Sequence, residues 1–233
     1  MRLIDILFPS NIKCIMCSKD LEEGYICDSC EKEIKYITNG CVKCGGSLIG
    51  DGDVCLECKK YERVFDKGFC VCEYDGKIKE KILKFKNHNG KFLYKPFAQM
   101  MLDKYKTLNL EIDVIIPIPI HTNRRKERGF DQCELLVEKI AEYSGKVDMN
   151  VIYRKKDTPH QVGLNRENRI TNLEDAFELC KGASVKGKDV LIIDDIFTTG
   201  TTIDECASFL KKNGASNIYF LCLARTPIGV PLD

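Results

Sequence analysis

Four Cys-x-x-Cys pairs near the amino end account for eight of the fourteen cysteines in the chain. Two such pairs that face each other supply four thiolates, which is a closed tetrahedral set for a structural zinc ion. Disulfides are rare in cytosolic proteins, and a redox Cys-x-x-Cys would occur once beside a β-α-β unit rather than four times. The spacing therefore predicts two zinc sites, paired sequentially in the simplest arrangement, with an interleaved pairing left open. The predicted ligands are Cys14, Cys17, Cys27, Cys30, Cys41, Cys44, Cys55 and Cys58.

A second chemical signal is the segment 190–202, in which an apolar run is followed by two carboxylates and a threonine–glycine loop. Backbone N–H groups and hydroxyls of such a loop, together with a helix N-terminus, can wrap a phosphomonoester. Paired carboxylates beside that loop suit the two hydroxyls of a ribose, and open α/β sheets bind ligands at the carboxyl ends of their strands. The segment therefore predicts a ribose-phosphate site made by Asp194, Asp195, Thr198, Thr199, Gly200, Thr201 and Thr202.

Residues 190–202 resemble, without a break, the signature of phosphoribosyl pyrophosphate (PRPP) sites in type I phosphoribosyltransferases. The resemblance implies that the ligand is PRPP or a related ribose phosphate, bound with Mg²⁺. A P-loop nucleotide triphosphatase is the competing interpretation, because residues 182–188 nearly spell a Walker A loop. That loop is followed by Asp189, where Ser or Thr must hold Mg²⁺, and it leads into a strand instead of a helix, so we reject this class.

Two basic segments are candidates for the pyrophosphate side of the site. An apolar run at 113–118 leads into a basic loop that contains Arg125 and Arg128. The stretch 155–172 is polar, has no apolar period and carries Arg166 and Arg169. Long loops of this kind in compact domains are usually functional or disordered. A solvated surface loop is the alternative for any single arginine.

Four further motifs are spread over the second half of the chain. They are Pro117-Ile118-Pro119, then Arg125 with Arg128-Gly129-Phe130-Asp131-Gln132, the spaced set Gln161, Leu164, Arg166, Arg169 and Asn172, and finally Ala176-Phe177. With the cysteine pairs in front, they resemble the ComF family of competence proteins, of the ComFC type. Asp131 departs from the commoner Asn of that family, and Asn168 stands where a Glu often precedes the arginine. The resemblance implies a phosphoribosyltransferase fold used in natural transformation, in which single-stranded DNA enters the cytoplasm beside a membrane-associated, ComFA-like helicase.

The chain after the cysteine pairs alternates apolar runs with helical periods, which is typical of an α/β domain with a mainly parallel sheet. We therefore expect a short amphipathic N-terminal helix and a small double zinc ribbon at 1–65, followed by a type I phosphoribosyltransferase-like domain at 66–233. The predicted strands are 68–74, 113–118, 150–154, 189–194 and 217–224, and the predicted helices are 77–86, 94–107, 132–144 and 202–213.

Net charge gives no global argument for nucleic-acid binding, since 36 Lys and Arg residues balance 35 Asp and Glu residues. Residues 1–65 hold 9 basic and 11 acidic side chains, and two zinc ions with deprotonated ligands bring this module to about −6. Such a surface is a poor binder of phosphate backbones, which favours a scaffold or protein-docking role. Apolar stretches are too short for membrane insertion and the first residues do not form a secretory signal, so we expect a cytoplasmic protein.

Residues 77–95 contain seven lysines against a single acid, Glu80, with aromatic residues between them. Three of these lysines, Lys77, Lys81 and Lys84, share one face of the predicted helix. Clustered lysines beside aromatic rings match a non-specific site for single-stranded DNA. The alternative is an amphipathic surface helix whose aromatic residues belong to the core.

These observations support two functional hypotheses. The first is a ComF-type protein that binds PRPP with Mg²⁺ and single-stranded DNA and acts in DNA uptake, recruited to the inner face of the membrane. The second is an active phosphoribosyltransferase that transfers phosphoribose to an unidentified acceptor. Release of pyrophosphate in the presence of candidate acceptors separates the two.

Overall fold

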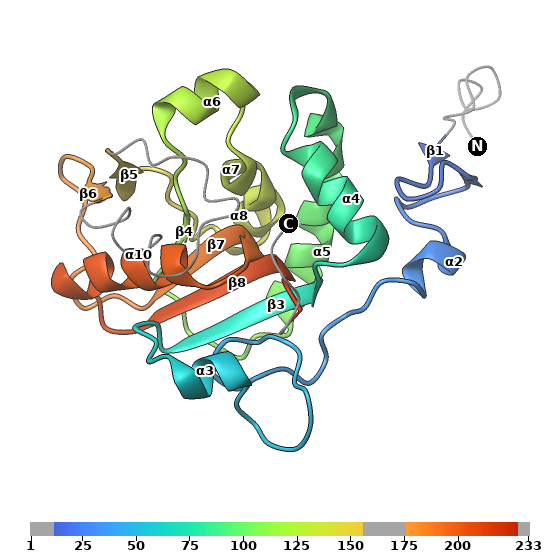
Figure 1. Cartoon of the computed structure of the whole chain (residues 1–233). Helices are drawn as coiled ribbons and strands as arrows, with labels where there is room; N and C mark the ends of the chain where they lie inside the picture. Colours follow the sequence, from blue (N-terminus) through green and yellow to red (C-terminus); the bar gives the residue numbers. More distant parts are fainter. Residues whose placement is uncertain (1–11, 156–175, 228–233) are drawn as a thin grey trace.

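Four apolar runs form the central sheet of the domain (Figure 1). The computed structural model describes residues 12–155 and 176–227. The strand order is β3-β8-β7-β4, and all three neighbouring pairs are parallel, as the sequence predicts. The strands are β3 (Lys67–Glu73), β4 (Val114–Pro117), β7 (Val190–Phe197) and β8 (Ile218–Arg225).

Helices cover both faces of this sheet, because its strands bury alternate side chains on opposite sides. On one face Leu191 and Ile193 belong to a core with side chains of several helices, namely α4 (Gly76–Phe85), α5 (Tyr94–Lys106), α7 (Gln132–Leu136) and α8 (Glu138–Ser144). On the other face Val190 and Ile192 belong to a second core with α10 (Thr201–Lys212) and with cysteines of the second zinc ribbon.

Short elements make up the two ribbons and the connections between the larger elements. The zinc-ribbon region contains β1 (Ile12–Lys13), β2 (Asp20–Leu21), α2 (Asp28–Glu31) and α3 (Leu56–Lys60). The 3₁₀ helix η1 (His88–Leu93) joins α4 to α5, and α6 (Thr122–Arg128) follows β4. Among residues 12–155 and 176–227, no helix has the length and apolar character needed to cross a bilayer.

The strand predicted at 150–154 forms, but it does not join the parallel sheet. It is β5 (Ile152–Arg154), which pairs antiparallel with β6 (Phe177–Leu179) in a separate two-stranded sheet. Period and propensity locate a strand but do not choose its partner. Strand β6 was not predicted, because a segment of three residues is too short to show a hydrophobic period.

Three other boundaries differ from the sequence-based prediction. The basic segment after β4 is the helix α6 and not a loop. The segment predicted as one helix at 132–144 forms two helices, α7 and α8. They meet at Val137, whose backbone angles remain helical. Strand β7 continues to Phe197 because its last residues still pair with Ala224 and Arg225 of β8. The two carboxylates therefore lie within the strand, not after its end.

Candidate functional site

The acidic pair on β7 lies in a largely buried environment. Asp194 accepts a hydrogen bond from the Asp195 backbone N–H at 2.8 Å, and the Cys133 thiol lies 3.5 Å from Asp194 Oδ1. Burial, followed by the neighbouring charge of Asp195, raises the pKa of Asp194 to about 7. The two adjacent carboxylates therefore differ, since Asp195 has a cation beside it and Asp194 has a thiol.

That cation is Lys86, which the sequence-based analysis did not assign to this site. Its Nζ lies 3.1 Å from Asp195 Oδ2, at the C-cap of α4. The pKa of Lys86 is raised, since the carboxylate of Asp195 outweighs the effect of burial, while the charge of Arg128 opposes it. The position of Lys86 could have been predicted from its spacing. It lies four residues after the buried Ile82, so it points toward the apolar side of the helix.

The threonine–glycine loop follows directly after the acidic strand. Gly200 has a φ of +82°, which favours glycine, and serves as the N-cap of α10. A Cβ at Gly200 would lie 2.5 Å from the Phe197 ring and 2.7 Å from Arg63 Nη1. The hydroxyls of Thr199 and Thr201 are 2.9 Å apart. The residues predicted to bind the phosphate, Thr198 to Thr202, therefore form one tight turn into a twelve-residue helix.

The pyrophosphate candidates that the structure describes belong to α6, which follows β4. Arg125 makes a bidentate pair with Glu134, at 2.7 and 2.6 Å, and Arg128 donates to Gln132 Oε1 at 2.8 Å. Arg166 and Arg169 lie outside the described residues, so their role stays a prediction.

Asp131, the departure from the commoner Asn of the resembled family, caps α7. Its Oδ1 accepts from the backbone N–H groups of Cys133 at 2.9 Å and Glu134 at 3.3 Å, and its Oδ2 accepts from Ile120 at 3.2 Å. The residue is 3% exposed, and burial raises its pKa. This side chain therefore fixes the turn that places α7 and Cys133 beside Asp194.

The eight predicted zinc ligands gather in two clusters, in each of which the four sulfur atoms lie within 4.8 Å of one another. The first cluster joins the first two pairs and the second joins the last two, so the sequential pairing is confirmed and the interleaved one is wrong. In the first cluster a hydrogen bond with Ser29 lowers the pKa of Cys27 to about 6, whereas burial raises that of Cys30 to about 12. Four ionised thiolates at this separation require a cation, and this donor set fits zinc.

The three predicted DNA lysines do not have equal surroundings. Lys77 Nζ contacts Glu33 at 2.8 Å and the Cys30 sulfur at 3.5 Å, which connects it to the first ribbon. Lys84 is exposed, and its Nζ lies 5.2 Å from the centre of the Phe92 ring. Lys81 is half-buried. Of the interleaved aromatic residues Phe85 belongs to the core, as the alternative interpretation expects, whereas Phe92 is 55% exposed.

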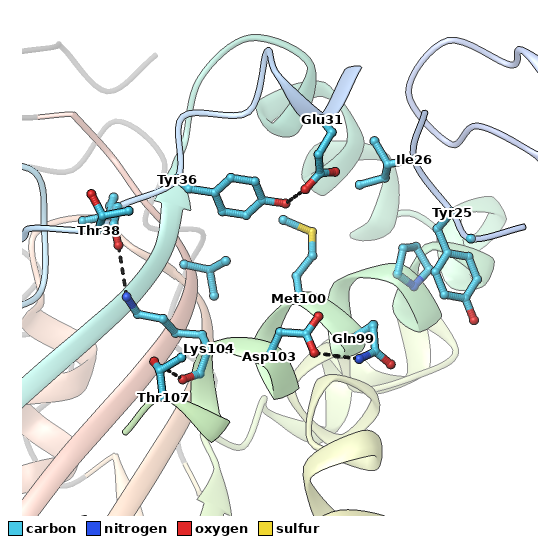
Figure 2. A pocket seen from close by; sticks show the side chains of 14 residues that line it. Tyr25, Ile26, Glu31, Tyr36, Thr38, Gln99, Met100, Asp103, Lys104 and Thr107 are labelled. Carbon is cyan, nitrogen blue, oxygen red and sulfur yellow. Dashed lines mark hydrogen bonds between the residues drawn. The ribbon is translucent and has the colours of Figure 1, made fainter. Parts of the chain in front are cut away.

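A cavity of about 690 Å³ lies between the first ribbon and α5 (Figure 2). Its polar groups are bonded to one another: Tyr36 donates to Glu31 at 2.7 Å, and Gln99 donates to Asp103 at 2.9 Å. Lys104 closes one side by donating to the Ile37 carbonyl at 3.0 Å. The lining contains none of the residues that the sequence predicts to bind a ligand.

The chain matches two family descriptions. The phosphoribosyl transferase domain matches residues 93–233, which is more than half of the chain, and the double zinc ribbon domain matches residues 3–59. Competence protein F of Haemophilus influenzae is 30% identical over 224 residues, which cover 92% of this chain and 97% of that protein. The chain belongs to the ComF family. The predicted family and the predicted fold class are thereby confirmed.

Other relatives of this ComF protein match over similar lengths. The DNA utilization protein YhgH of Salmonella typhimurium is 27% identical over 221 residues, covering 91% of this chain and 96% of that protein. Competence protein ComFC of Streptococcus pneumoniae is 25% identical over 235 residues, covering 92% of this chain and 100% of that protein. The ComF chain therefore resembles these relatives across the zinc ribbons and the transferase-type domain together.

Proposed function

We propose that this ComF protein binds PRPP, or a related ribose phosphate, with Mg²⁺ and acts in the uptake of DNA. The observation that carries the proposal is the order of chemical groups from β7 to α10, in which two carboxylates precede a threonine–glycine turn. Asp194 and Asp195 near the end of β7 are followed, after Ile196 and Phe197, by the turn at Gly200 and the N-terminus of α10. The names of the relatives, competence protein F and DNA utilization protein, support the process.

Each group has a distinct task in this proposal. The backbone N–H groups and hydroxyls of Thr198 to Thr202 hold the 5′-phosphate, and the two carboxylates hold the ribose hydroxyls, directly or through Mg²⁺. Lys86 supplies a counter-charge to Asp195, because its Nζ lies 3.1 Å from Asp195 Oδ2. Arg125 and Arg128 on α6, together with Arg166 and Arg169, then form the proposed pyrophosphate side.

Calorimetric titration of PRPP with Mg²⁺ tests the site. The double variant Asp194→Asn and Asp195→Asn keeps the shapes of both side chains but removes their charges, so the affinity should fall at least about tenfold. Glu22→Gln with Glu23→Gln is the matched control, because these neighbouring acids are exposed in the first ribbon. Absence of binding by the wild type at millimolar ligand would reject the proposal.

Transferase activity is the second candidate, and the pKa of Asp194 favours it. A buried carboxyl group that titrates near pH 7 can exchange a proton with an acceptor during the reaction. Loss of pyrophosphate would leave positive charge on the ribose, which the carboxylates would stabilise while Mg²⁺ and the basic groups hold the leaving group. Pyrophosphate release on addition of candidate bases or amines is the measurement that distinguishes a transferase from a binding protein.

Single-stranded DNA is the proposed second ligand. The exposed Phe92 ring offers a face for base stacking, and Lys81, Lys84, Lys91 and Lys95 surround it in the sequence. A ComFA-like helicase at the inner face of the membrane is the proposed protein partner, and the acidic ribbon module is the surface we assign to protein docking.

A further inference from the structure

We infer that the second zinc ribbon positions the phosphate-binding loop, so that binding of a ribose phosphate depends on zinc at Cys41, Cys44, Cys55 and Cys58. The inference rests on the proposed function for the identity of the ligand. The juxtaposition that carries it is a continuous chain of contacts from the Cys55-x-x-Cys58 turn, through two buried arginines, to the carbonyl groups of Thr198 and Thr199.

The first step of this chain is Glu57, which lies between the zinc ligands Cys55 and Cys58 on α3. Its Oε2 is 3.1 Å from Arg225 Nη2 and 3.6 Å from Arg63 Nη2. The side chains of Arg63 and Arg225 are only 1% and 3% exposed. Two buried guanidinium groups need a counter-charge, and Glu57 supplies it to both of them.

The second step joins the arginines to the loop. Arg225 Nη1 donates to the Thr198 carbonyl at 2.9 Å and to the Thr226 carbonyl at 2.6 Å. Arg63 Nη1 donates at 2.8 Å both to the Thr199 carbonyl and to Asp204 Oδ2 in the first turn of α10. Both guanidinium groups also lie over the Phe197 ring.

These bonds determine which way the loop presents its donors. A trans peptide is planar, and its N–H points opposite to its carbonyl. When the carbonyls of Thr198 and Thr199 point toward the arginines, the N–H groups of Thr199 and Gly200 point the other way, toward the proposed phosphate. Gly200 also leaves space for the guanidinium, since a Cβ there would lie 2.7 Å from Arg63 Nη1.

Zinc holds Glu57 in place because its neighbours Cys55 and Cys58 are ligands. Loss of the metal frees this turn and withdraws Glu57, which leaves the buried Arg225 without its carboxylate partner and Arg63 with Asp204 alone. The loop then loses the donors that orient it. The first ribbon lacks this connection in the described part of the chain, because its equivalent position is the exposed Ser29 between Cys27 and Cys30.

Two charge-neutralising variants separate this coupling from a general effect of the ribbons. Glu57→Gln keeps the zinc ligands and the side-chain shape, and Asp28→Asn removes the same charge from the equivalent turn of the first ribbon. We expect Glu57→Gln to retain two zinc ions per chain, to lower the affinity for Mg²⁺–PRPP at least about tenfold, and to speed amide exchange in residues 197–202. Asp28→Asn should change neither the affinity for Mg²⁺–PRPP nor the amide exchange of residues 197–202. Glu57→Asp, which keeps the charge, should retain more affinity than Glu57→Gln.

Removal of one zinc ligand from each ribbon gives a second comparison. Cys58→Ser and Cys17→Ser alter the least buried ligand of the second and the first cluster, respectively. Only Cys58→Ser should weaken binding and speed exchange in the loop, and Glu57→Gln carries the test if Cys58→Ser does not fold. Wild-type affinity and unchanged exchange in Glu57→Gln would overturn the inference but leave the proposed function intact. Faster exchange in a protein whose wild type binds no PRPP would keep the positioning role and reject the proposed ligand.

Discussion

Two adjacent aspartates on one strand acquire different properties from their surroundings. Asp195 lies beside the ammonium group of Lys86, whereas Asp194 lies beside the buried thiol of Cys133. Burial and the charge of Asp195 consequently raise the pKa of Asp194 to about 7. Near neutral pH, Asp194 is therefore partly protonated. This difference allows the pair to bind Mg²⁺ or a ribose with a net charge that depends on pH.

The raised pKa of Asp194 predicts how stability responds to pH. A carboxyl group with a pKa of about 7 in the folded protein and about 4 in the unfolded chain favours folding most below pH 4. That contribution is lost as the pH rises through 7. Asp194→Asn removes the titration, so its melting temperature relative to the wild type should rise between pH 5 and pH 8. Thermal melts of the zinc-loaded, ligand-free proteins measure this, and a constant difference over that range would contradict it.

At the scale of an element, the turn into α10 combines an unusual backbone conformation with a close contact. Gly200 has a φ of +82° and touches both Phe197 and Arg63. Gly187 is a useful comparison, because its φ is +72° but nothing lies within 4 Å of an added Cβ. The two glycines share the backbone requirement and differ only in what surrounds them.

Gly200→Ala should therefore be more harmful than Gly187→Ala. Both variants carry backbone strain of about 1 kcal/mol or more, and only Gly200→Ala also displaces Arg63 and the Phe197 ring. We expect Gly200→Ala to unfold at lower denaturant concentration than Gly187→Ala and to lose most of its PRPP affinity. Urea unfolding and calorimetry measure the two effects, and equal behaviour of the two variants would show that the contact is unimportant.

Helix α4 with η1 carries the proposed DNA surface, on which Lys84, Lys91 and Phe92 are exposed. Phe92→Ala should weaken single-strand binding by about 1–3 kcal/mol through lost stacking. Lys81→Ala with Lys84→Ala should reduce the slope of affinity against salt by about 1.4. Lys77→Ala should have a smaller effect on DNA, because Lys77 is paired with Glu33.

Fluorescence anisotropy with an oligonucleotide at several salt concentrations measures these effects. Lys181→Ala with Lys188→Ala removes two exposed lysines from the turn before β7 and serves as the control. If the slope of DNA affinity against salt is unchanged in the Lys81 and Lys84 variant, α4 is not the DNA site. The alternative interpretation, an amphipathic helix that covers the core, would then hold.

At the scale of the whole molecule, the two zinc ribbons have different neighbours. The first contacts α4 through Lys77, and the second packs on the sheet, where the Gly68 N–H donates to the Lys43 carbonyl at 2.8 Å. A Cβ at Gly45 would lie 2.5 Å from the Gly68 carbonyl oxygen, so this approach requires glycine. The second ribbon is therefore structurally part of the transferase-type domain, although it precedes that domain in the sequence.

This arrangement predicts the zinc content and its effect on stability. Elemental analysis of the reduced protein, purified without chelators, should give two zinc ions per chain. Cys17→Ser and Cys58→Ser should each bind one, and Cys58→Ser should melt at the lower temperature, because its ribbon contacts the buried Arg63 and Arg225 through Glu57 and bonds to Gly68 of the sheet. Less than one zinc ion per wild-type chain would contradict the assignment of both clusters.

Features that depend on neighbours along the chain can be predicted from the amino-acid sequence. Sequential zinc clusters follow from short loops between cysteine pairs, which bring the four thiols of each cluster together locally. The turn at Gly200 follows from residues 198–202, and the buried strands follow from apolar runs such as 190–193. Hydrogen bonding and hydrophobic period act over a few residues, so they can be read without knowing the fold.

The distant side chains that complete the site are brought there by the packing of whole helices and strands. Arg63 and Thr199 are 136 residues apart, and Lys86 reaches Asp195 only because α4 packs on the face of the sheet that Ile193 lines. Tertiary packing also brings Lys77 into an ion pair with Glu33. It pairs β5 with β6 instead of adding β5 to the parallel sheet. A lysine or arginine has the same local pattern whether it is solvated or buried against a carboxylate. Its partner is chosen by how whole elements fill space around one another, and the local sequence does not record that choice.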